Sequence, residues 1–466
     1  MRKANLTEAI ISMLAVITFL GFGLFVFGAD PQIPLILGCV FIASMGIFRL
    51  KFSWSDLEES ILDTIMKGMQ AILILLVVGM LIGTWILSGI VPSMIYYGLD
   101  ILSPSIFLVA TTIICAIVSI STGSSWTTVG TIGIALVGIG QTLGMPLQII
   151  AGAIISGAYF GDKMSPLSDT TNLAPAMAGT NLFDHIKHML YSTVPAFLIS
   201  LILYGIIGFK YSGQSIDSTQ INIMKDTLLS SFNTLSPILL IAPALVILMV
   251  VLKVPALPGL LIGTLLGGFM AIIFQGSSVG NVINVMHYGY LSETGVSLVD
   301  DLLSRGGLDS MLWTVSLILC ALSLGGMLEK TGILDAIATA VLKIAKGTFG
   351  VVFATISTCI FTNIVIGDQY LAIVVPGTMY KDEFRKRNLA PQNLSRALED
   401  SATVTSPLIP WNTCGAYMMA TLGVSPILYL PFAFFNILTP IISLTLAATG
   451  ISMTKLNENN KKDLVA

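Results

Sequence analysis

Two polar, proline-containing stretches that carry carboxylates interrupt an otherwise apolar chain. The first runs from Gly161 to Asn172 (GDKMSPLSDTTN), and the second runs from Glu399 to Thr413 (EDSATVTSPLIPWNT). Both lie among segments apolar enough to cross a bilayer, where polar backbone is tolerated only if it lines a cavity or is buried in protein. We therefore expect the chemistry of the protein at these two stretches.

Five carboxylates at or near these stretches are the first candidates for that chemistry. An ionised Asp at the centre of a bilayer costs at least about 2.5 to 3.5 kcal/mol, so an acid at that depth indicates a function. A buried carboxylate can hold either a proton or a sodium ion, which makes exchange of the two ions at one site feasible. The five residues are Asp162, Asp169, Asp368, Glu399 and Asp400.

Most of these carboxylates also have a simpler interpretation. Asp162 could form a salt bridge with the lysine that follows it, and Asp169 could be a plain helix N-cap. Glu399 and Asp400 could pair with Arg396 as a charged cluster at a cytoplasmic entrance. These interpretations stay open at the level of the sequence.

The composition determines the class of protein. Of 466 residues, 55% are hydrophobic and only 10% are charged, whereas a soluble domain carries about 25% charged residues. Apolar runs near the length of a membrane-spanning helix recur throughout, which favours helices over a barrel. The net charge of −3 leaves no basic surface for nucleic acid. We expect a multi-pass α-helical protein of the cytoplasmic membrane, surrounded by lipid.

Apolar runs in the first half predict the elements that position the first polar stretch. The segment 51–67 is amphipathic and is predicted to rest at the membrane interface, and Val91 to Leu102 is predicted to be a short surface helix. The predicted apolar helices are Ala9 to Gly28, Ile33 to Phe48, Gly68 to Leu87, Ser105 to Ser119, Val129 to Leu143, Leu147 to Phe160 and Met189 to Gly208.

The second half repeats the first. Ser165-Pro166-Leu167 matches Ser406-Pro407-Leu408, and segments beginning at Pro34 and Ser88 match segments beginning at Pro258 and Thr331 in the same order. Three collinear matches at nearly constant offset predict an internal duplication. The predicted parts are a first transmembrane repeat (1–210), a linker (211–234), a second transmembrane repeat (235–450) and a polar C-terminal tail (451–466).

Basic residues predict how the two repeats are oriented. Arg49, Lys51 and Lys67 place the loop after the second span in the cytoplasm, together with the basic N-terminus. The corresponding loop of the second half, Gln275 to Gly307, is mainly acidic and is predicted to lie outside. The halves are therefore predicted to be inverted, with both termini on the cytoplasmic side.

Charge counting also predicts two re-entrant hairpins. Basic residues flank the segment Phe349 to Met379 on both sides, so the chain should leave the cytoplasmic side and return to it, with its tip at Thr362 to Asp368. By repeat symmetry, Ser121 to Thr128 should be the tip of a second hairpin. Four polar breaks then meet near the membrane centre, where inverted-repeat transporters bind substrates and ions.

Three segments resemble the NhaC family of sodium/proton antiporters, within the ion transporter superfamily. They are Gly161 to Met189, the segment from Thr362 through GDQYLAIVVPG, and Glu399 to Tyr417. The resemblance covers nearly the whole chain. It implies an all-α polytopic fold of two inverted repeats, each with a re-entrant hairpin and a broken helix that meet at the midplane. Some relatives exchange malate plus protons for sodium and lactate, so the resemblance indicates sodium coupling better than it indicates the substrate.

The polar breaks and the resemblance together indicate the residues that bind ions or substrate. Hydroxyl, amide and carboxylate oxygens suit a hard cation such as Na⁺, and a subset of Asp162, Asp169, Asn363, Asp368 and Ser406 is expected to hold it. The transported ions are expected to be Na⁺ and H⁺, with no cofactor and no catalytic residue. The candidates are Ser124, Asp162, Ser165, Asp169, Thr170, Thr171, Thr362, Asn363, Asp368, Glu399, Asp400, Thr405, Ser406 and Asn412.

The leading hypothesis is a sodium/proton antiporter that works by alternating access, and a homodimer is considered. The close alternative is a sodium-coupled carboxylate exchanger, whose small organic acid would sit against hydroxyls and helix N-termini at Ser165 to Thr171 and Ser406 to Thr413. An obvious intramembrane arginine is missing, which weakens this alternative. A distant alternative is an intramembrane aspartyl protease built on the Gly-Asp pairs at Asp162 and Asp368, although both lack the usual Gly-x-Gly-Asp pattern.

Overall fold

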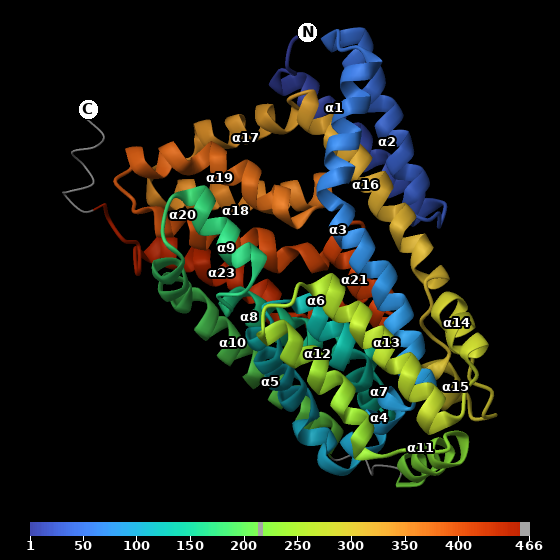
Figure 1. Ribbon diagram of the computed structural model, residues 1–466. Helices are drawn as coiled ribbons and strands as arrows, with labels where there is room; N and C mark the ends of the chain where they lie inside the picture. Colours follow the sequence, from blue (N-terminus) through green and yellow to red (C-terminus); the bar gives the residue numbers. More distant parts are fainter. Residues whose placement is uncertain (213–217, 457–466) are drawn as a thin grey trace.

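The computed structural model describes residues 1–212 and 218–456, and the chain folds as a bundle of packed helices (Figure 1). In the described ranges, 8 helices are long and apolar enough to cross a membrane, or up to 9 if one bent pair counts as a span. The predicted all-α polytopic class is confirmed. The eight are Leu6–Leu24, Gln32–Leu50, Trp54–Leu87, Pro104–Thr122, Leu182–Tyr211, Ala256–Gln275, Asp309–Lys330 and Gly347–Ile366.

The helices of the first half surround the first polar stretch, which separates α8 from α9. They are α1 (Leu6–Gly21), α2 (Gln32–Ser44), α3 (Trp54–Leu87), α4 (Ile90–Ile101), α5 (Pro104–Thr122), α6 (Ser125–Thr128), α7 (Ile134–Thr142), α8 (Leu147–Met164), α9 (Asp169–Ala178) and α10 (Leu182–Ser212). In the second half, the π-helical turn Glu399–Thr403 continues α20, and a break precedes α21. The remaining helices are α11 (Ser218–Ser231), α12 (Ile241–Val251), α13 (Ala256–Gln275), α14 (Val279–Tyr288), α15 (Ser297–Leu303), α16 (Leu312–Lys330), α17 (Ile333–Ile344), α18 (Gly347–Ile366), α19 (Gln369–Lys386), α20 (Pro391–Leu398), α21 (Thr413–Leu422), α22 (Pro426–Tyr429) and α23 (Phe434–Thr449).

Corresponding helices in the two halves end at glycines with left-handed backbone. Gly89 (φ 81°) follows α3 and Gly332 (φ 73°) follows α16, and the next helix in each half has 12 residues. Gly123 (φ 68°) follows α5 and Gly367 (φ 71°) follows α18. A side chain at positive φ is strained, so glycine is the residue that lets each helix stop and turn there. The order of elements therefore recurs, while the inversion of the halves and the boundaries at 210, 235 and 450 stay predictions.

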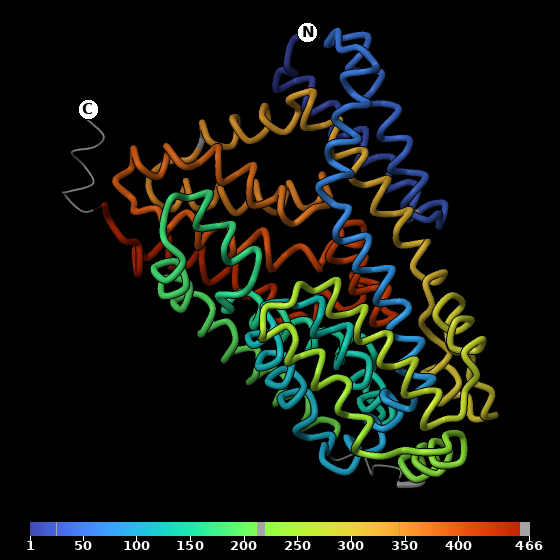
Figure 2. The backbone as a smooth tube through the Cα atoms, viewed as in Figure 1, coloured from blue at the N-terminus to red at the C-terminus, as the bar shows by residue number. Residues whose placement is uncertain are grey.

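Helices α18 and α19 form a hairpin, which is visible in the backbone trace (Figure 2). At the end of α19, the Arg387 guanidinium donates to the carbonyl of Ala345 (3.0 Å) and to that of Gly347 (2.7 Å), beside the start of α18. The hairpin turns at Gly367 and Asp368, and the Asp368 carboxylate caps α19 by accepting the N–H of Leu371 (2.9 Å). The chain thus returns to where it began, and entry of this hairpin into the membrane from one side stays a prediction.

Helices α5 and α8 pack closely through small residues, and this contact positions the first polar stretch. A methyl group at Gly157 would lie 2.2 Å from the carbonyl oxygen of Thr112, and one at Gly161 would lie 2.4 Å from that of Ala116. Hydroxyl groups join the helices as well, because Ser119 donates to the Ala158 carbonyl (2.6 Å). Small residues four positions apart allow such close approach of helices in membranes.

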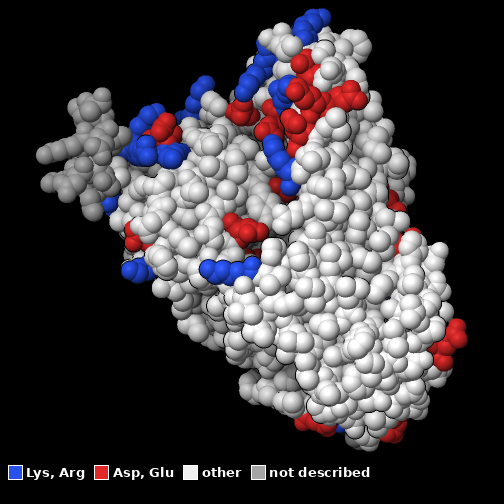
Figure 3. All heavy atoms as spheres, in the orientation of Figure 1, with Lys and Arg blue, Asp and Glu red and all other residues white. Residues whose placement is uncertain are grey.

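Charged side chains gather at the edges of the molecule and leave a broad uncharged belt between them (Figure 3). Ion pairs at one end join segments distant in sequence: Lys3 lies 2.6 Å from Asp335, and Lys330 lies 3.5 Å from Glu59. The N-terminus, the start of α3, the end of α16 and the start of α17 therefore meet there. These are segments that charge counting assigned to a common side.

Three expectations about individual segments need correction or limits. The segment 51–67 is not a separate interfacial element, since its residues from Trp54 onward are the first turns of α3. The predicted surface helix 91–102 corresponds to α4, which is buried along one side because it packs against α7. In the predicted linker, α11 contacts α4 and α15, whereas 213–217 and, in the predicted tail, 457–466 lie outside the described residues.

Gly157→Ala is expected to separate α5 from α8, since its methyl group would overlap the Thr112 carbonyl. Overpacking of this kind costs about 1–3 kcal/mol, so the midpoint of thermal unfolding in detergent should fall. Gly21→Ala is the matched control, because a methyl group there has no neighbour within 4 Å among the described residues. Equal midpoints for the two variants would contradict the packing described here.

Candidate functional site

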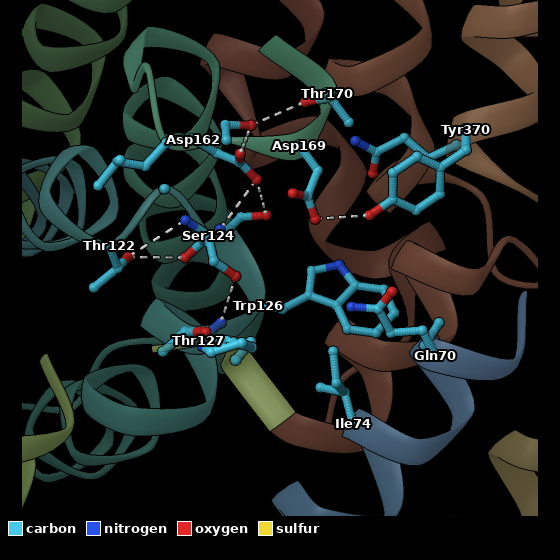
Figure 4. A pocket seen from close by; sticks show the side chains of 18 of the residues that line it. Gln70, Ile74, Thr122, Ser124, Trp126, Thr127, Asp162, Asp169, Thr170 and Tyr370 are labelled. Atoms are coloured by element: carbon cyan, nitrogen blue, oxygen red, sulfur yellow. Dashed lines mark hydrogen bonds between the residues drawn. The ribbon is translucent and has the colours of Figure 1, made fainter. Parts of the chain in front are cut away.

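A cavity of about 480 Å³ lies where the turn at Gly123 after α5, the turn between α18 and α19, the α8–α9 break and α3 meet (Figure 4). Its walls combine three carboxylates with hydroxyl, amide and indole groups. Among the polar and charged residues that line it are Lys67, Gln70, Thr122, Ser124, Ser125, Trp126, Thr127, Asp162, Ser168, Asp169, Thr170, Lys253, Asp368, Gln369, Tyr370 and Thr413.

Asp162, in the last turn of α8, is the most strongly hydrogen-bonded carboxylate of the cavity. One carboxylate oxygen accepts the backbone N–H (3.0 Å) and the hydroxyl (2.6 Å) of Ser125, just after the first hairpin turn. The other oxygen accepts the hydroxyl of Ser168 (2.5 Å), the N-cap of α9. Asp162 is 8% exposed. Three donors to one carboxylate stabilise its charged form, which a cation could then approach from the cavity.

The other two carboxylates belong to opposite walls. Asp169 begins α9, is exposed to the cavity, and faces the hydroxyl of Tyr370 at 3.4 Å (Figure 4). Asp368 is 2% exposed and caps α19, so its carboxylate lies at the second hairpin turn. Asp162 and Asp169 come from the two sides of the α8–α9 break, whereas Asp368 comes from the α18–α19 turn. The cavity is therefore built from both halves of the chain.

A second polar cluster, outside the cavity lining, joins α18 to the break before α21. The Asn363 amide donates to the Ala402 carbonyl (2.7 Å) and the Thr405 hydroxyl (3.1 Å). The Asn412 amide donates to the side-chain oxygen (3.1 Å) and backbone carbonyl (3.2 Å) of Asn363. The hydroxyl of Ser406 donates to Gln369 (3.2 Å), which itself lines the cavity.

Behind the cavity, Lys163 and Asp400 form an ion pair without solvent exposure. The Lys163 ammonium lies 2.6 Å from Asp400, and both side chains are 0% exposed. The Ser192 hydroxyl also donates to Asp400 (2.8 Å), and the guanidinium of Arg396, 1% exposed, lies 3.8 Å away. The proposed pairing of Asp162 with Lys163 is therefore wrong, and Glu399 and Asp400 are buried rather than located at an entrance. Arg396 is thus a buried arginine, although the sequence had shown no obvious intramembrane arginine.

Glu399 immediately precedes Asp400 in the sequence and is also 0% exposed. Across the described part of the chain, neither carboxylate oxygen of Glu399 has a hydrogen-bond partner in good geometry. The hydroxyl of Thr403, one turn later, has none either. Its polar neighbours are the Lys163 ammonium and the hydroxyls of Thr403 and Thr170. A buried carboxylate without donors is costly to ionise, in contrast to Asp162.

Two lysines line the opening of the cavity. Lys253 lies between α12 and α13 with left-handed backbone (φ 64°), and Lys67 lies on α3 near the acidic residue Glu329 (3.9 Å). In the space-filling view, acidic and basic side chains meet in a hollow within the uncharged belt (Figure 3). The opening therefore offers charge of both signs.

The predicted site residues fall into four groups. Ser124, Asp162, Asp169, Thr170 and Asp368 line the cavity, while Asn363, Thr405, Ser406 and Asn412 form the second cluster, and Glu399 and Asp400 lie behind. The remaining three hydroxyls donate to the backbone: Ser165 to Ile120 (2.7 Å), Thr171 to Lys163 (3.0 Å) and Thr362 to Thr358 (2.8 Å). Whether each residue of these groups binds an ion stays a prediction.

Sequence reasoning missed several residues of the site. Ser125 and Ser168 supply the donors to Asp162, and each is adjacent to a residue that was chosen. Gln70 and Lys253 line the cavity from α3 and from the turn after α12. A polar amide in the apolar run after Gly68 was a usable signal, whereas nothing local indicated that Lys253 would reach the cavity.

Known proteins similar to this chain are membrane antiporters. A sequence profile of the "Na+/H+ antiporter family" matches residues 157–451. The Na(+)/H(+) antiporter NhaC of Alkalihalophilus pseudofirmus is 42% identical, covering 97% of this chain and 98% of its own. The malate-2H(+)/Na(+)-lactate antiporter of Bacillus subtilis is 40% identical, covering 88% and 87%. The arginine/ornithine antiporter ArcD of Halobacterium salinarum is 36% identical, covering 97% and 93%.

Lys163→Met is expected to destabilise the protein strongly, because it leaves the Asp400 carboxylate buried without its ammonium partner. Breaking a buried pair in this way costs about 3–5 kcal/mol, which thermal unfolding in detergent would register. The double variant Lys163→Met with Asp400→Leu should recover most of the loss. The matched control is Lys386→Met, whose exposed pair with Glu383 contributes little; equal losses in both lysine variants would contradict the structural role of Lys163.

Proposed function

The chain belongs to the Na⁺/H⁺ antiporter family, and we propose that it exchanges Na⁺ for H⁺ across the cytoplasmic membrane by alternating access. The observation that carries this proposal is the cavity into which Asp162, Asp169 and Asp368 face. Three carboxylates in a recess of low dielectric constant create a negative potential that attracts small cations. The donors around Asp162 keep it available as a carboxylate for Na⁺.

The proposed Na⁺ site is centred on Asp162 and Asp368. Hydroxyl and carbonyl oxygens complete the shell of a hard cation, and Ser125, Ser168 and Thr170 bring hydroxyl groups to the lining of the cavity. Asn363 and Ser406 would then support the site through the second cluster. Na⁺ and H⁺ each neutralise negative charge among the buried carboxylates, so binding of one ion favours release of the other.

Alternating access would follow from the two helical hairpins and the two broken helices. These elements surround the cavity, whereas α3 crosses the molecule as one 34-residue helix and packs against α13 and α16. We propose that the hairpins and broken helices move against the long helices. The protein then acts as a transporter and not as an enzyme, with Na⁺ and H⁺ as its cargo and no cofactor.

A second candidate function is sodium-coupled exchange of a small carboxylate. The cavity volume of about 480 Å³ lies within the range of about 300–1,000 Å³ typical of small-molecule sites. Lys253 and Lys67 could pair with an organic carboxylate at the opening. Two relatives are named as antiporters of organic substrates, malate with lactate and arginine with ornithine. The cavity has space for a small organic acid in addition to a Na⁺ ion.

The proposed orientation places both termini in the cytoplasm. It is supported by the common end at which the basic N-terminus, the end of α16 and the start of α17 meet. Lipid surrounds the uncharged belt seen in Figure 3. A homodimer is part of the proposal, and crosslinking in membranes would test it.

Na⁺ efflux from liposomes that contain the purified protein is expected to acidify the lumen, because each departing Na⁺ is exchanged for entering protons. Asp162→Asn and Asp368→Asn should each weaken Na⁺ binding by roughly 10- to 100-fold, since a charged ligand contributes about 1.5–3 kcal/mol. Asn caps helices as well as Asp, so the second variant keeps the start of α19. Asp309→Asn, at an exposed position, is the control, and wild-type exchange in both test variants would refute the proposed ligands.

Uptake of labelled malate or lactate distinguishes carboxylate exchange from exchange of Na⁺ and H⁺ alone. If a carboxylate is carried, a Na⁺ gradient should drive its uptake. Lys253→Gln should then raise the carboxylate concentration needed for half-maximal uptake by roughly tenfold, because one charged contact is lost. Lys343→Gln, exposed and away from the cavity, should leave uptake unchanged. Absence of uptake, with Na⁺/H⁺ exchange intact, would eliminate the carboxylate function alone.

A further inference from the structure

The buried region behind the cavity contains a carboxylate whose surroundings are the opposite of those of Asp162. Asp162 receives three hydrogen bonds, whereas in residues 1–212 and 218–456 neither oxygen of Glu399 has a hydrogen-bond partner. Glu399 is 0% exposed. When two acids have such different environments, the one without donors favours the neutral, protonated form.

A line of hydroxyls connects the two acids. The Ser168 hydroxyl donates to Asp162 (2.5 Å) and lies 3.2 Å from the hydroxyl of Thr170. Thr170 lines the cavity and is also a polar neighbour of Glu399. Hydroxyl groups both donate and accept, so Thr170, once its hydroxyl forms a hydrogen bond with Glu399, can pass a proton to the cavity that it lines.

The charged groups around Glu399 would couple the two acids. From α8, Asp162 repels a negative charge at Glu399 and Lys163 attracts one. The same ammonium is held by Asp400, which also lies 3.8 Å from the guanidinium of Arg396 on α20. While Asp162 is a bare carboxylate, its repulsion favours the protonated form of Glu399. A Na⁺ on Asp162 cancels that repulsion, and the Lys163 ammonium then stabilises the carboxylate that remains.

We propose that Glu399 carries the exchanged proton, at a site distinct from the sodium-binding carboxylates, and that Na⁺ at Asp162 releases this proton through Thr170. The inference rests on the proposed Na⁺/H⁺ exchange. The charges balance, since one Na⁺ arrives as the O–H bond of Glu399 breaks and one proton leaves. Reprotonation of Glu399 removes the negative charge that favours Na⁺ at the neighbouring Asp162, so Na⁺ binding weakens and Na⁺ leaves.

The test measures proton release on Na⁺ binding, with the full-length protein in detergent. Na⁺ is added to a weakly buffered solution with a pH-indicating dye, and radioactive sodium measures binding. Wild-type protein should release protons. Glu399→Gln, which mimics the protonated acid, should still bind Na⁺, although more weakly than wild type, and should lose proton release, whereas Asp162→Asn should weaken Na⁺ binding and lose proton release as well. Glu58→Gln, an exposed acid on α3, should behave as wild type.

Thr170→Val provides a second, milder test that leaves Glu399 in place, and it should slow proton release without changing its amount. An unchanged rate in this variant would overturn the hydroxyl path. Three results would overturn the role of Glu399: wild-type protein that binds Na⁺ without releasing protons, Glu399→Gln protein with undiminished release, or folded Glu399→Gln protein that no longer binds Na⁺. Because binding is measured without transport, failure of exchange in liposomes refutes the proposed function separately.

Discussion

Polar groups in the membrane interior depend on partners within the protein, and this constraint organises the structure. Water is not available there to solvate freed carbonyls or carboxylates. The two helix breaks satisfy the constraint by facing the hairpin turns, so that Ser125 and Ser168 stabilise Asp162 while Asn363 binds Asn412. The polar interior is therefore a consequence of two broken helices and two turns that complete one another.

The close packing of small residues allows this arrangement. Gly157 and Gly161 bring α8 against α5 with no space for a methyl group, which places the end of α8 beside the turn at Gly123. That turn then presents a backbone N–H and a hydroxyl to Asp162. The position of the Asp162 carboxylate thus depends on helix contacts that themselves contain no charge, as is common where helices associate in lipid.

The buried charges form two layers with different electrostatic properties. The cavity layer, with Asp162, Asp169 and Asp368, is open to ions, and the layer behind it, with Lys163 paired to Asp400, is closed. Burying an ion pair is costly unless its geometry is good, so a second layer of charge next to the first suggests a role in setting the charge of the cavity. Glu399 lies between the layers, where a change of charge on either side affects it.

The sequence by itself determined the class, most of the membrane helices, the polar breaks and the carboxylates of the cavity, because hydrophobicity, proline and glycine act locally along the chain. The sequence did not determine which side chains and helices pair with one another. The pairing of Lys163 with Asp400, the burial of α4, the continuity of α3 through residues 54–67 and the arrival of Lys253 at the cavity were decided by tertiary structure. The reason is that each depends on which helix packs against which, over distances along the chain that local patterns do not encode. Asp162 can be recognised from its neighbours in sequence, but the donors that stabilise its carboxylate reach it only through folding.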